Sequence, residues 1–133
     1  MLYLDANVFI YSLVDSGEKG KIAHMILESV VTGKDAAITS SLTIDEVLWI
    51  LLKNTERKTA ILEVLKIFEM QNLEIVGVTP DMSFKSLLLM QKYKGLKPRD
   101  AIHAAVCLSS GVFRIASDDA DFDQIKELER MKL

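Results

Sequence analysis

The chain has 133 residues, of which half are apolar and 26% are charged; this balance is typical of a globular protein and excludes extensive disorder. The formal net charge of −3 argues against a protein that simply coats nucleic acid, because such binding depends on Lys and Arg neutralising phosphates. The single cysteine cannot form an internal disulfide, no apolar run reaches the roughly 18 residues of a membrane span, and the first residues do not resemble a signal peptide. We therefore expect a cytoplasmic protein with one domain over residues 1–133 and no membrane segment.

Short apolar runs alternate along the chain with longer segments of helical apolar spacing. Strands that alternate with helices predict an α/β fold of three layers, in which helices cover both faces of a central parallel sheet of four or five strands. In chain order we predict a strand over Leu2–Leu4, helices over Val8–Leu13 and Lys19–Val31, a strand over Ala36–Thr39, helices over Ser41–Leu52 and Glu56–Met70, a strand over Leu73–Val78, a helix from Pro80 to about Tyr93, a helix that Pro98 opens and Gly111 closes, a strand over Val112–Ala116 and a short strand over Leu128–Met131.

Isolated carboxylates stand beside several of these apolar segments. Asp5 ends the first apolar run, Glu46 lies inside an apolar run with helical spacing, Asp100 opens the apolar run from Ala101 to Leu108, and Asp119 and Asp121 follow the last long apolar run. An acid beside buried sequence is costly unless it is paired, hydrogen-bonded or bound to a metal. Ligands of parallel sheets bind beyond the carboxyl ends of the strands, where strand order reverses, so Asp5 and Asp119 meet there if their strands are neighbours.

Some of these acids also have a purely structural explanation. Asp5 could be a turn or cap residue, although Asn7 has the stronger claim to cap the helix that follows. Asp100 interacts favourably with the positive end of its helix, by about 0.3–1 kcal/mol, and the same field keeps it ionised as a metal ligand must be. His103 lies one turn further on, and we expect it to be a packed or supporting residue with no catalytic role.

Glu46 has an alternative of its own. It completes a capping box with Thr43, which would tie its carboxylate to the start of the helix. Ser40 and Ser41 are equally good caps and stand closer to the end of the preceding strand. A helix that begins there places Glu46 in the second turn, where it is free to serve a site.

The last acidic segment is dense, and one site cannot use all of it. Asp118, Asp119, Asp121 and Asp123 follow one another in a short loop, and some of them must be solvated turn or cap residues. Which aspartate points inward is therefore left open by the sequence.

Positive charge gathers directly before Asp100. The segment from Met82 to Arg99 contains no acid, and it reads either as a solvated helix face or as a path for a phosphate backbone. Its place beside the suspected acidic centre favours the second interpretation. The five cations are Lys85, Lys92, Lys94, Lys97 and Arg99, and the last four make up the expected path for a phosphate backbone.

Carboxylates that share a pocket repel one another, and a divalent cation removes that repulsion. Mg²⁺ and Mn²⁺ prefer oxygen ligands, lower the pKa of bound water and stabilise the attacking and leaving oxygens of a phosphodiester. The sequence has no Gly-rich phosphate loop and no plausible Ser-His-Asp set. Metal-assisted phosphodiester hydrolysis is the chemistry that the residues support best.

Four segments resemble, in order and at ordinary spacing, the acidic motifs of the PIN domain family. They are Leu4–Val8 (LDANV), Ser41–Val47 (SLTIDEV), Pro98–Ala104 (PRDAIHA) and Ser117–Asp123 (SDDADFD). Each motif is weak alone, and together they are specific. The size and layout of the chain are most similar to the VapC-type toxins of bacteria and archaea.

This resemblance implies a PIN-like fold and a Mg²⁺- or Mn²⁺-dependent endoribonuclease. It assigns catalysis and metal binding to a quartet in which we expect Asp5 and Asp100 to be the direct ligands and the other acids to act through metal-bound water. Asn7 and Ser117 match residues that often support the site. The quartet is Asp5, Glu46, Asp100 and Asp119, with Asp121 as a frequent fifth acid and second choice.

The resemblance also implies partners. VapC-like proteins usually pair with a small antitoxin that lays a helix and an extended tail into an apolar groove, and they usually form homodimers. The stretch from Leu42 to Leu52, with Trp49, could contribute to such a groove, although core packing explains most of it.

Three other functions remain possible at this point. One is an RNA-processing PIN nuclease without an antitoxin, and another is a non-catalytic binding module of the same fold. The third is a phosphorelay receiver domain, which needs an acidic pair after its first strand and an aspartate at the end of a central strand. This chain has one acid after its first strand, and its third strand ends in Gly77-Val78-Thr79, which makes a receiver improbable.

Overall fold

The computed structural model describes every residue from Met1 to Leu133, and its centre is one sheet of five parallel strands in the order β3-β2-β1-β4-β5. This confirms the predicted α/β fold and the short last strand. Strand β1 lies in the middle, and its three side chains are almost completely shielded from solvent, which explains why its sequence is continuously apolar. The strands are β1 (Leu2–Leu4), β2 (Ala37–Ser40), β3 (Leu73–Val76), β4 (Arg114–Ala116) and β5 (Glu129–Met131).

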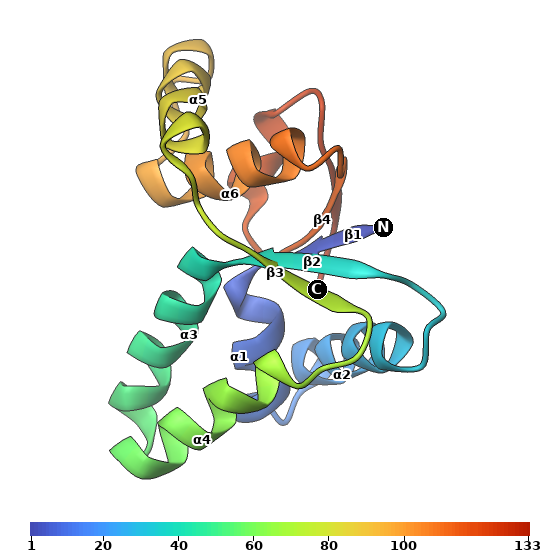
Figure 1. Cartoon of the computed structure of the whole chain (residues 1–133). Coiled ribbons are helices and arrows are strands. Elements are labelled where there is room, and N and C mark those ends of the chain that lie inside the picture. The colour runs from blue at the N-terminus through green and yellow to red at the C-terminus, as the bar shows by residue number, and fades with distance from the viewer.

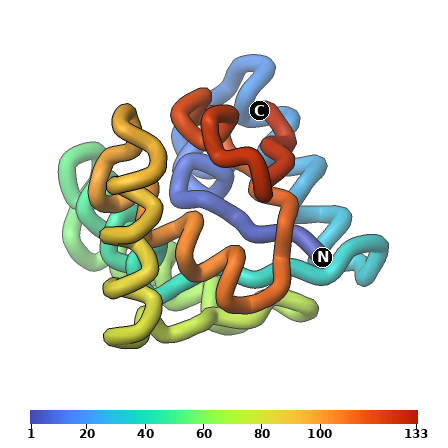
Figure 2. The backbone as a smooth tube through the Cα atoms, turned by 90° about the horizontal axis from the view of Figure 1, so that it is seen from above, coloured from blue at the N-terminus to red at the C-terminus, as the bar shows by residue number.

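Six helices and a 3-10 turn cover the two faces of this sheet. Helices α1 to α4 lie against one face, and α5 and α6 lie against the other (Figure 1). Figure 2 looks down on the second face and shows α5 beside α6. Each face has its own buried apolar cluster, so the three predicted layers are present. The elements are α1 (Ala6–Val14), α2 (Glu18–Val31), α3 (Ser41–Asn54), α4 (Arg57–Phe68), α5 (Pro80–Lys92), α6 (Pro98–Ser109) and the 3-10 turn η1 (Ala120–Gln124).

The strand order reverses beside β1. The chain runs outward from β1 through β2 to β3, crosses over α5 and α6, and returns as β4 on the opposite side of β1. A crevice therefore opens beyond the carboxyl ends of β1 and β4, as the sequence predicts for Asp5 and Asp119. The receiver hypothesis is wrong, because receiver domains have the strand order 2-1-3-4-5.

Two helix starts decide between alternatives that the sequence left open. Asp5 is the N-cap of α1, and its carboxylate accepts a hydrogen bond of 2.7 Å from the backbone N–H of Ala6. The expectation that Asn7 caps this helix is wrong, because Asn7 already lies inside its first turn. Helix α3 is capped by Ser40, which accepts from the backbone N–H of Thr43 at 3.4 Å. Glu46 therefore lies in the second turn, and the capping box that would tie it to Thr43 is not formed.

None of the six helices combines the length and the apolar character that crossing a membrane requires.

The first two helices pack without space between them at Gly20. A Cβ atom at this position would lie 1.9 Å from the carbonyl oxygen of Asp15 and 3.1 Å from that of Tyr11. Because glycine has only a hydrogen atom at this place, α2 can approach the C-terminal end of α1. Helix α1 begins directly after Asp5, so this packing supports the helix that carries the N-terminal part of the site.

We expect Gly20→Ala to destabilise the protein by about 1–3 kcal/mol, because the added methyl group forces the two helices apart. Gly77→Ala is the control, since no atom lies within 4 Å of a Cβ at Gly77. Urea unfolding would measure both variants. A Gly20→Ala protein as stable as the wild type would contradict this packing.

Candidate metal centre

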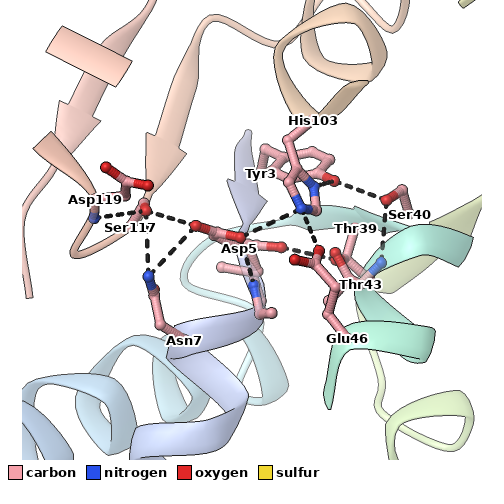
Figure 3. A network of polar contacts seen from close by, with 12 residues as sticks. Tyr3, Asp5, Asn7, Thr39, Ser40, Thr43, Glu46, His103, Ser117 and Asp119 are labelled. Atoms are coloured by element: carbon pink, nitrogen blue, oxygen red, sulfur yellow. Dashed lines mark hydrogen bonds and ion pairs between the residues drawn. The ribbon is translucent and has the colours of Figure 1, made fainter. Parts of the chain in front are cut away.

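Three of the predicted acids, Asp5, Glu46 and Asp119, lie around the crevice beyond β1 and β4 (Figure 3). Asp5 leaves the end of β1, Glu46 projects from α3, and Asp119 lies in the loop between β4 and η1. Asp100 and His103 come from the first two turns of α6, where they lie on one side of the helix. Segments about a hundred residues apart in sequence thus supply one site.

Asp5 is the most constrained of these carboxylates. Only 6% of the residue is exposed. Besides the Ala6 N–H on Oδ1, its Oδ2 atom accepts a hydrogen bond of 2.6 Å from the Ser117 hydroxyl and one of 3.4 Å from the Asn7 amide. Burial raises the pKa of Asp5, and the nearby His103 and the Ser117 hydroxyl oppose that rise. Its orientation is therefore fixed before any ligand arrives.

His103 connects the acids to the interior of the protein. It is 1% exposed, and its Nε2 atom lies 2.5 Å from Glu46 Oε1 and 3.5 Å from Asp5 Oδ1. Its Nδ1 atom lies 2.5 Å from the hydroxyl of Tyr3, which in turn donates to Ser40 Oγ at 2.9 Å. Burial works against a charged ring, but the hydrogen bond to Glu46 and the charge of Asp5 prevail and raise the pKa of His103. The imidazole is thus held in place between Tyr3 and the acids, and these contacts favour its protonated form.

This agrees with the supporting role expected for His103. The part played by Tyr3 was missed, because Tyr3 stands in an otherwise aliphatic strand. The sequence feature that indicates this role is the Tyr3 hydroxyl, since a buried tyrosine hydroxyl usually needs a hydrogen-bond partner.

The second half of the site is a group of three aspartates. Carboxylate oxygens of Asp100, Asp119 and Asp121 lie within 4.8 Å of one another. Burial, and then the charges of Asp119 and Asp5, raise the pKa of Asp100 from 3.8 to about 7. The backbone N–H groups orient the loop, since Asp119 donates to Ser117 Oγ at 3.0 Å and Asp121 donates to Asp119 Oδ1 at 2.9 Å.

The other two aspartates of the acidic loop have partners elsewhere. Asp118 accepts hydrogen bonds from Lys19 at 2.6 Å and from the Tyr11 hydroxyl at 3.1 Å. Asp123 accepts from the Arg130 guanidinium at 2.8 and 2.9 Å. The geometry therefore leaves Asp119 and Asp121 as the members of this loop that join Asp100.

A cleft of about 540 Å³ lies over these acids, and two of the predicted RNA-path cations line it. Lys97 and Arg99 share it with the acids, and Lys97 Nζ lies 3.9 Å from Asp121 Oδ2. Lys92 and Lys94 are exposed but do not line the cleft, and Lys92 is paired with Glu127 at 3.1 Å. The six lining residues are Glu46, Lys97, Pro98, Arg99, Asp100 and Asp119.

The donor set fits a hard divalent cation. Ligand atoms of Asp5, Glu46 and His103 form a second group within 4.8 Å of one another, beside that of Asp100. Both nitrogens of His103 are already engaged by Glu46 and Tyr3, so the free donors are carboxylate oxygens, which such cations prefer. Burial, and then repulsion from Asp119 and Asp5, raise the pKa of Asp100, and a bound cation would oppose both effects.

Comparison with known proteins agrees with this fold and shows the family. The family model of the PIN domain matches residues 2–128, so the chain belongs to the PIN domain family. Among curated proteins, it is 27% identical to "Ribonuclease VapC23" of Mycobacterium tuberculosis over 122 residues, which cover 90% of this chain and 93% of that protein.

Solved structures show the same fold at lower identity. The Mycobacterium tuberculosis toxin VapC20, described as cleaving the sarcin-ricin loop, superposes with a TM-score of 0.80 at 16% identity over 95% of both chains. VapBC2 from Rickettsia felis, bound to a DNA fragment from its promoter, gives a TM-score of 0.76 at 20% identity over 99% of this chain and 98% of that chain.

We expect Tyr3→Phe to weaken metal binding without removing any ligand. The change leaves the Nδ1 atom of His103 without its buried partner, which costs about 1–3 kcal/mol of stability. Loss of a ligand's outer partner lowers metal affinity by roughly 10- to 100-fold, and because Tyr3 acts on Glu46 only through His103, we expect the effect at the lower end of this range. Isothermal titration calorimetry with Mn²⁺ would measure the change.

Tyr93→Phe is the matched control, because the Tyr93 hydroxyl bonds Glu127 at 2.9 Å and does not contact the acids. It should lose some stability and keep its Mn²⁺ affinity. Equal Mn²⁺ affinities in the two variants would contradict the role given to Tyr3.

The pKa of Asp100 predicts an unusual pH dependence of stability. Between about pH 4 and 7 the folded, metal-free protein retains a proton on Asp100 that the unfolded chain releases, so Asp100 lowers stability as pH rises through this window. In EDTA above pH 7, Asp100→Asn should therefore be more stable than the wild type, with the difference shrinking toward pH 4. With Mn²⁺ the order should reverse, because the cation stabilises only the folded wild type.

Asp118→Asn is the control, because it should change the free energy of unfolding in the opposite direction. The ion pair with Lys19 holds the pKa of Asp118 below its usual value, so this substitution should lower stability at neutral pH and have no effect below the pKa of the folded state. Denaturant unfolding across this pH range would compare the variants. A pH-independent difference between Asp100→Asn and the wild type would show that folding does not raise the pKa of Asp100.

Proposed function

We propose that this protein is a Mg²⁺- or Mn²⁺-dependent endoribonuclease that hydrolyses RNA phosphodiester bonds, and that it is a toxin of the VapC type. The observation that carries the proposal is the convergence of two acidic groups, Asp5 with Glu46 and Asp100 with Asp119 and Asp121, at a cleft that Glu46, Asp100 and Asp119 line together with Lys97 and Arg99. Membership of the PIN domain family and the VapC ribonucleases among its relatives support it.

In this proposal Asp5 and Asp100 are the direct ligands, and Glu46, Asp119 and Asp121 complete the acidic centre. The bound cation would stabilise the charge that develops on the phosphodiester oxygens. The protein's own groups prepare that place: Ser117 and Asn7 orient Asp5, and His103 holds Glu46 at 2.5 Å. Preorganised charges of this kind require little rearrangement during the reaction.

The RNA backbone would approach over the basic side of the cleft. Arg99 forms no ion pair within the protein, and Lys97 lies near Asp121 with most of its side chain exposed. Both can therefore contact a phosphate without first losing a strong partner. Lys92 and Lys94 precede Lys97 in the chain and lie outside the cleft, and they would extend the path with weaker contacts.

We also propose an antitoxin partner. The solved relatives include toxin–antitoxin complexes, and Figure 1 places α4 on the outside of the layer that contains α1 and α2. Helix α4 exposes Leu62, Leu65 and Phe68, and a hollow beside it is lined mainly by apolar residues of α1, α2 and α4. This surface fits an amphipathic helix better than the stretch from Leu42 to Leu52 does, where Val47 and Leu51 are buried in the core.

A homodimer is the remaining part of the proposal. Helix α5 exposes Phe84, Leu87 and Leu88, which lie three and four residues apart and hence on one side of the helix. An exposed apolar stripe of this kind is typical of a helix that packs against another chain.

We expect the purified protein to cut end-labelled RNA when Mn²⁺ or Mg²⁺ is present and to stop when EDTA is added. Asp5→Asn, Asp100→Asn and Asp119→Asn should each lower the rate by at least about 100-fold, since each removes a charge that the transition state needs. Asp118→Asn and Asp123→Asn are matched controls from the same loop, because their carboxylates pair with Lys19 and Arg130 instead.

Cutting that survives all three site substitutions would contradict the proposal. A wild type that neither binds Mn²⁺ nor cuts RNA would favour a non-catalytic module. Activity without any antitoxin gene beside the protein's own would favour an RNA-processing nuclease over a toxin.

A further inference from the structure

A second hollow adjoins the acidic cleft. It has a volume of about 230 Å³ and lies between α3 and the start of α6. Glu46 and Arg99 line both spaces, so a ligand in one is a direct neighbour of a ligand in the other. The lining residues are Asp45, Glu46, Trp49, Ile50 and Arg99.

Three of the side chains that line this hollow, Asp45, Trp49 and Arg99, are exposed and are not part of the buried core. Asp45 is exposed and forms no ion pair, and the same is true of Arg99. Trp49 is 61% exposed, which is unusual for the largest apolar side chain. Lys53 lies over the Trp49 ring, 4.6 Å from its centroid, but does not line the hollow, so the indole surface that does is uncovered.

Their spacing makes the three groups act together. Asp45 and Trp49 lie one turn apart on α3, and residues four positions apart share a side of the helix. Arg99 approaches the same space from the first turn of α6, next to the metal-site residue Asp100. An aromatic surface, a carboxylate and a guanidinium therefore surround one space beside the acids.

These are the groups that recognise an unpaired nucleotide. Bases of single-stranded RNA stack on aromatic rings and are read along their Watson–Crick edges. A carboxylate offers two acceptor oxygens, and guanine is the one standard RNA base whose Watson–Crick edge carries two adjacent N–H donors, at N1 and N2. Adenine, cytosine and uracil each present one donor group beside acceptors.

We propose that this hollow is a guanine subsite that sets which phosphodiester the enzyme cuts. Trp49 stacks on the base, Asp45 accepts from its N1–H and N2–H groups, and Arg99 binds the phosphate that connects this nucleotide with the acidic cleft. The subsite rests on the proposed nuclease function, since it selects the substrate of that same site. A protein segment is disfavoured as the occupant, because three of the five lining residues are charged and Ile50 is the one aliphatic residue among them.

The chain contains a single tryptophan, so its fluorescence reports on this hollow directly. The wild type would be titrated with GMP, AMP, CMP and UMP in Mg²⁺; these mononucleotides contain no phosphodiester to be cut, so binding is read without turnover. GMP should quench Trp49 at a concentration at least about tenfold lower than the other three, the preference expected for a paired hydrogen-bond contact. Asp45→Asn should abolish this preference, whereas Asp81→Asn, which removes an exposed carboxylate on α5, should retain it.

Equal quenching by all four nucleotides would overturn the assignment to guanine, and so would a GMP preference that survives in Asp45→Asn. Absence of quenching by any nucleotide would overturn the base subsite altogether and leave the hollow to a protein segment.

Cleavage supplies a second test that separates this subsite from the nuclease itself. With RNA oligonucleotides that contain each base at the position next to the cut, Trp49→Leu should lower the cutting rate by roughly tenfold or more, and Trp49→Phe should restore most of it. If the wild type cuts but Trp49→Leu and Asp45→Asn keep its rate and base preference, the subsite alone is wrong. If the wild type does not cut any RNA, the proposed function is wrong, while the nucleotide titration still shows whether the hollow binds guanine.

Discussion

Repulsion among carboxylates at the carboxyl ends of β1 and β4 is the constraint on which the rest of the site depends. Hydrogen bonds relieve part of it, since the Ala6 N–H and the Ser117 hydroxyl both donate to Asp5. His103 relieves another part through its contact with Glu46. At Asp100 the relief is incomplete, because burial and the charges of Asp119 and Asp5 outweigh the opposing effect of His103 and raise its pKa to about 7. The folded chain therefore holds a negative site that is completed best by a cation.

The topology makes this concentration of charge possible. The two strands that carry Asp5 and Ser117 are separated by 112 residues in sequence, but they pair directly because the strand order reverses at β1. Helices α3 and α6 approach from opposite faces of the sheet and bring Glu46 and His103 into contact (Figures 1 and 3). The central strand β1 also supports the hydrogen-bond network of the site, because its Tyr3 is buried and connects Ser40 with His103. Stability of the core and order of the site thus depend on the same strand.

Much of this could be predicted from the sequence, because the main acids interrupt apolar segments whose periodicity is clear. Alternating strands and helices predicted the parallel sheet, and the position of Asp5 and Asp119 after two strands predicted that they meet. Local patterns failed where tertiary contacts decide. Asn7 and Asp5 are about equally good caps by propensity, and the tertiary contacts of Asn7 with Asp5 and Ser117 decide between them. The choice among the loop aspartates depends on Lys19 and Arg130, whose positions no local pattern reveals.

Diffraction from crystals grown with Mn²⁺, measured where manganese scatters anomalously, tests the central claim most directly. The account predicts an anomalous peak in the cleft within bonding distance of Asp5 and Asp100 oxygens, with His103 still turned toward Glu46. A peak at another place, or a cleft without a peak at Mn²⁺ concentrations that support activity, would contradict the claim that these carboxylates are a metal centre.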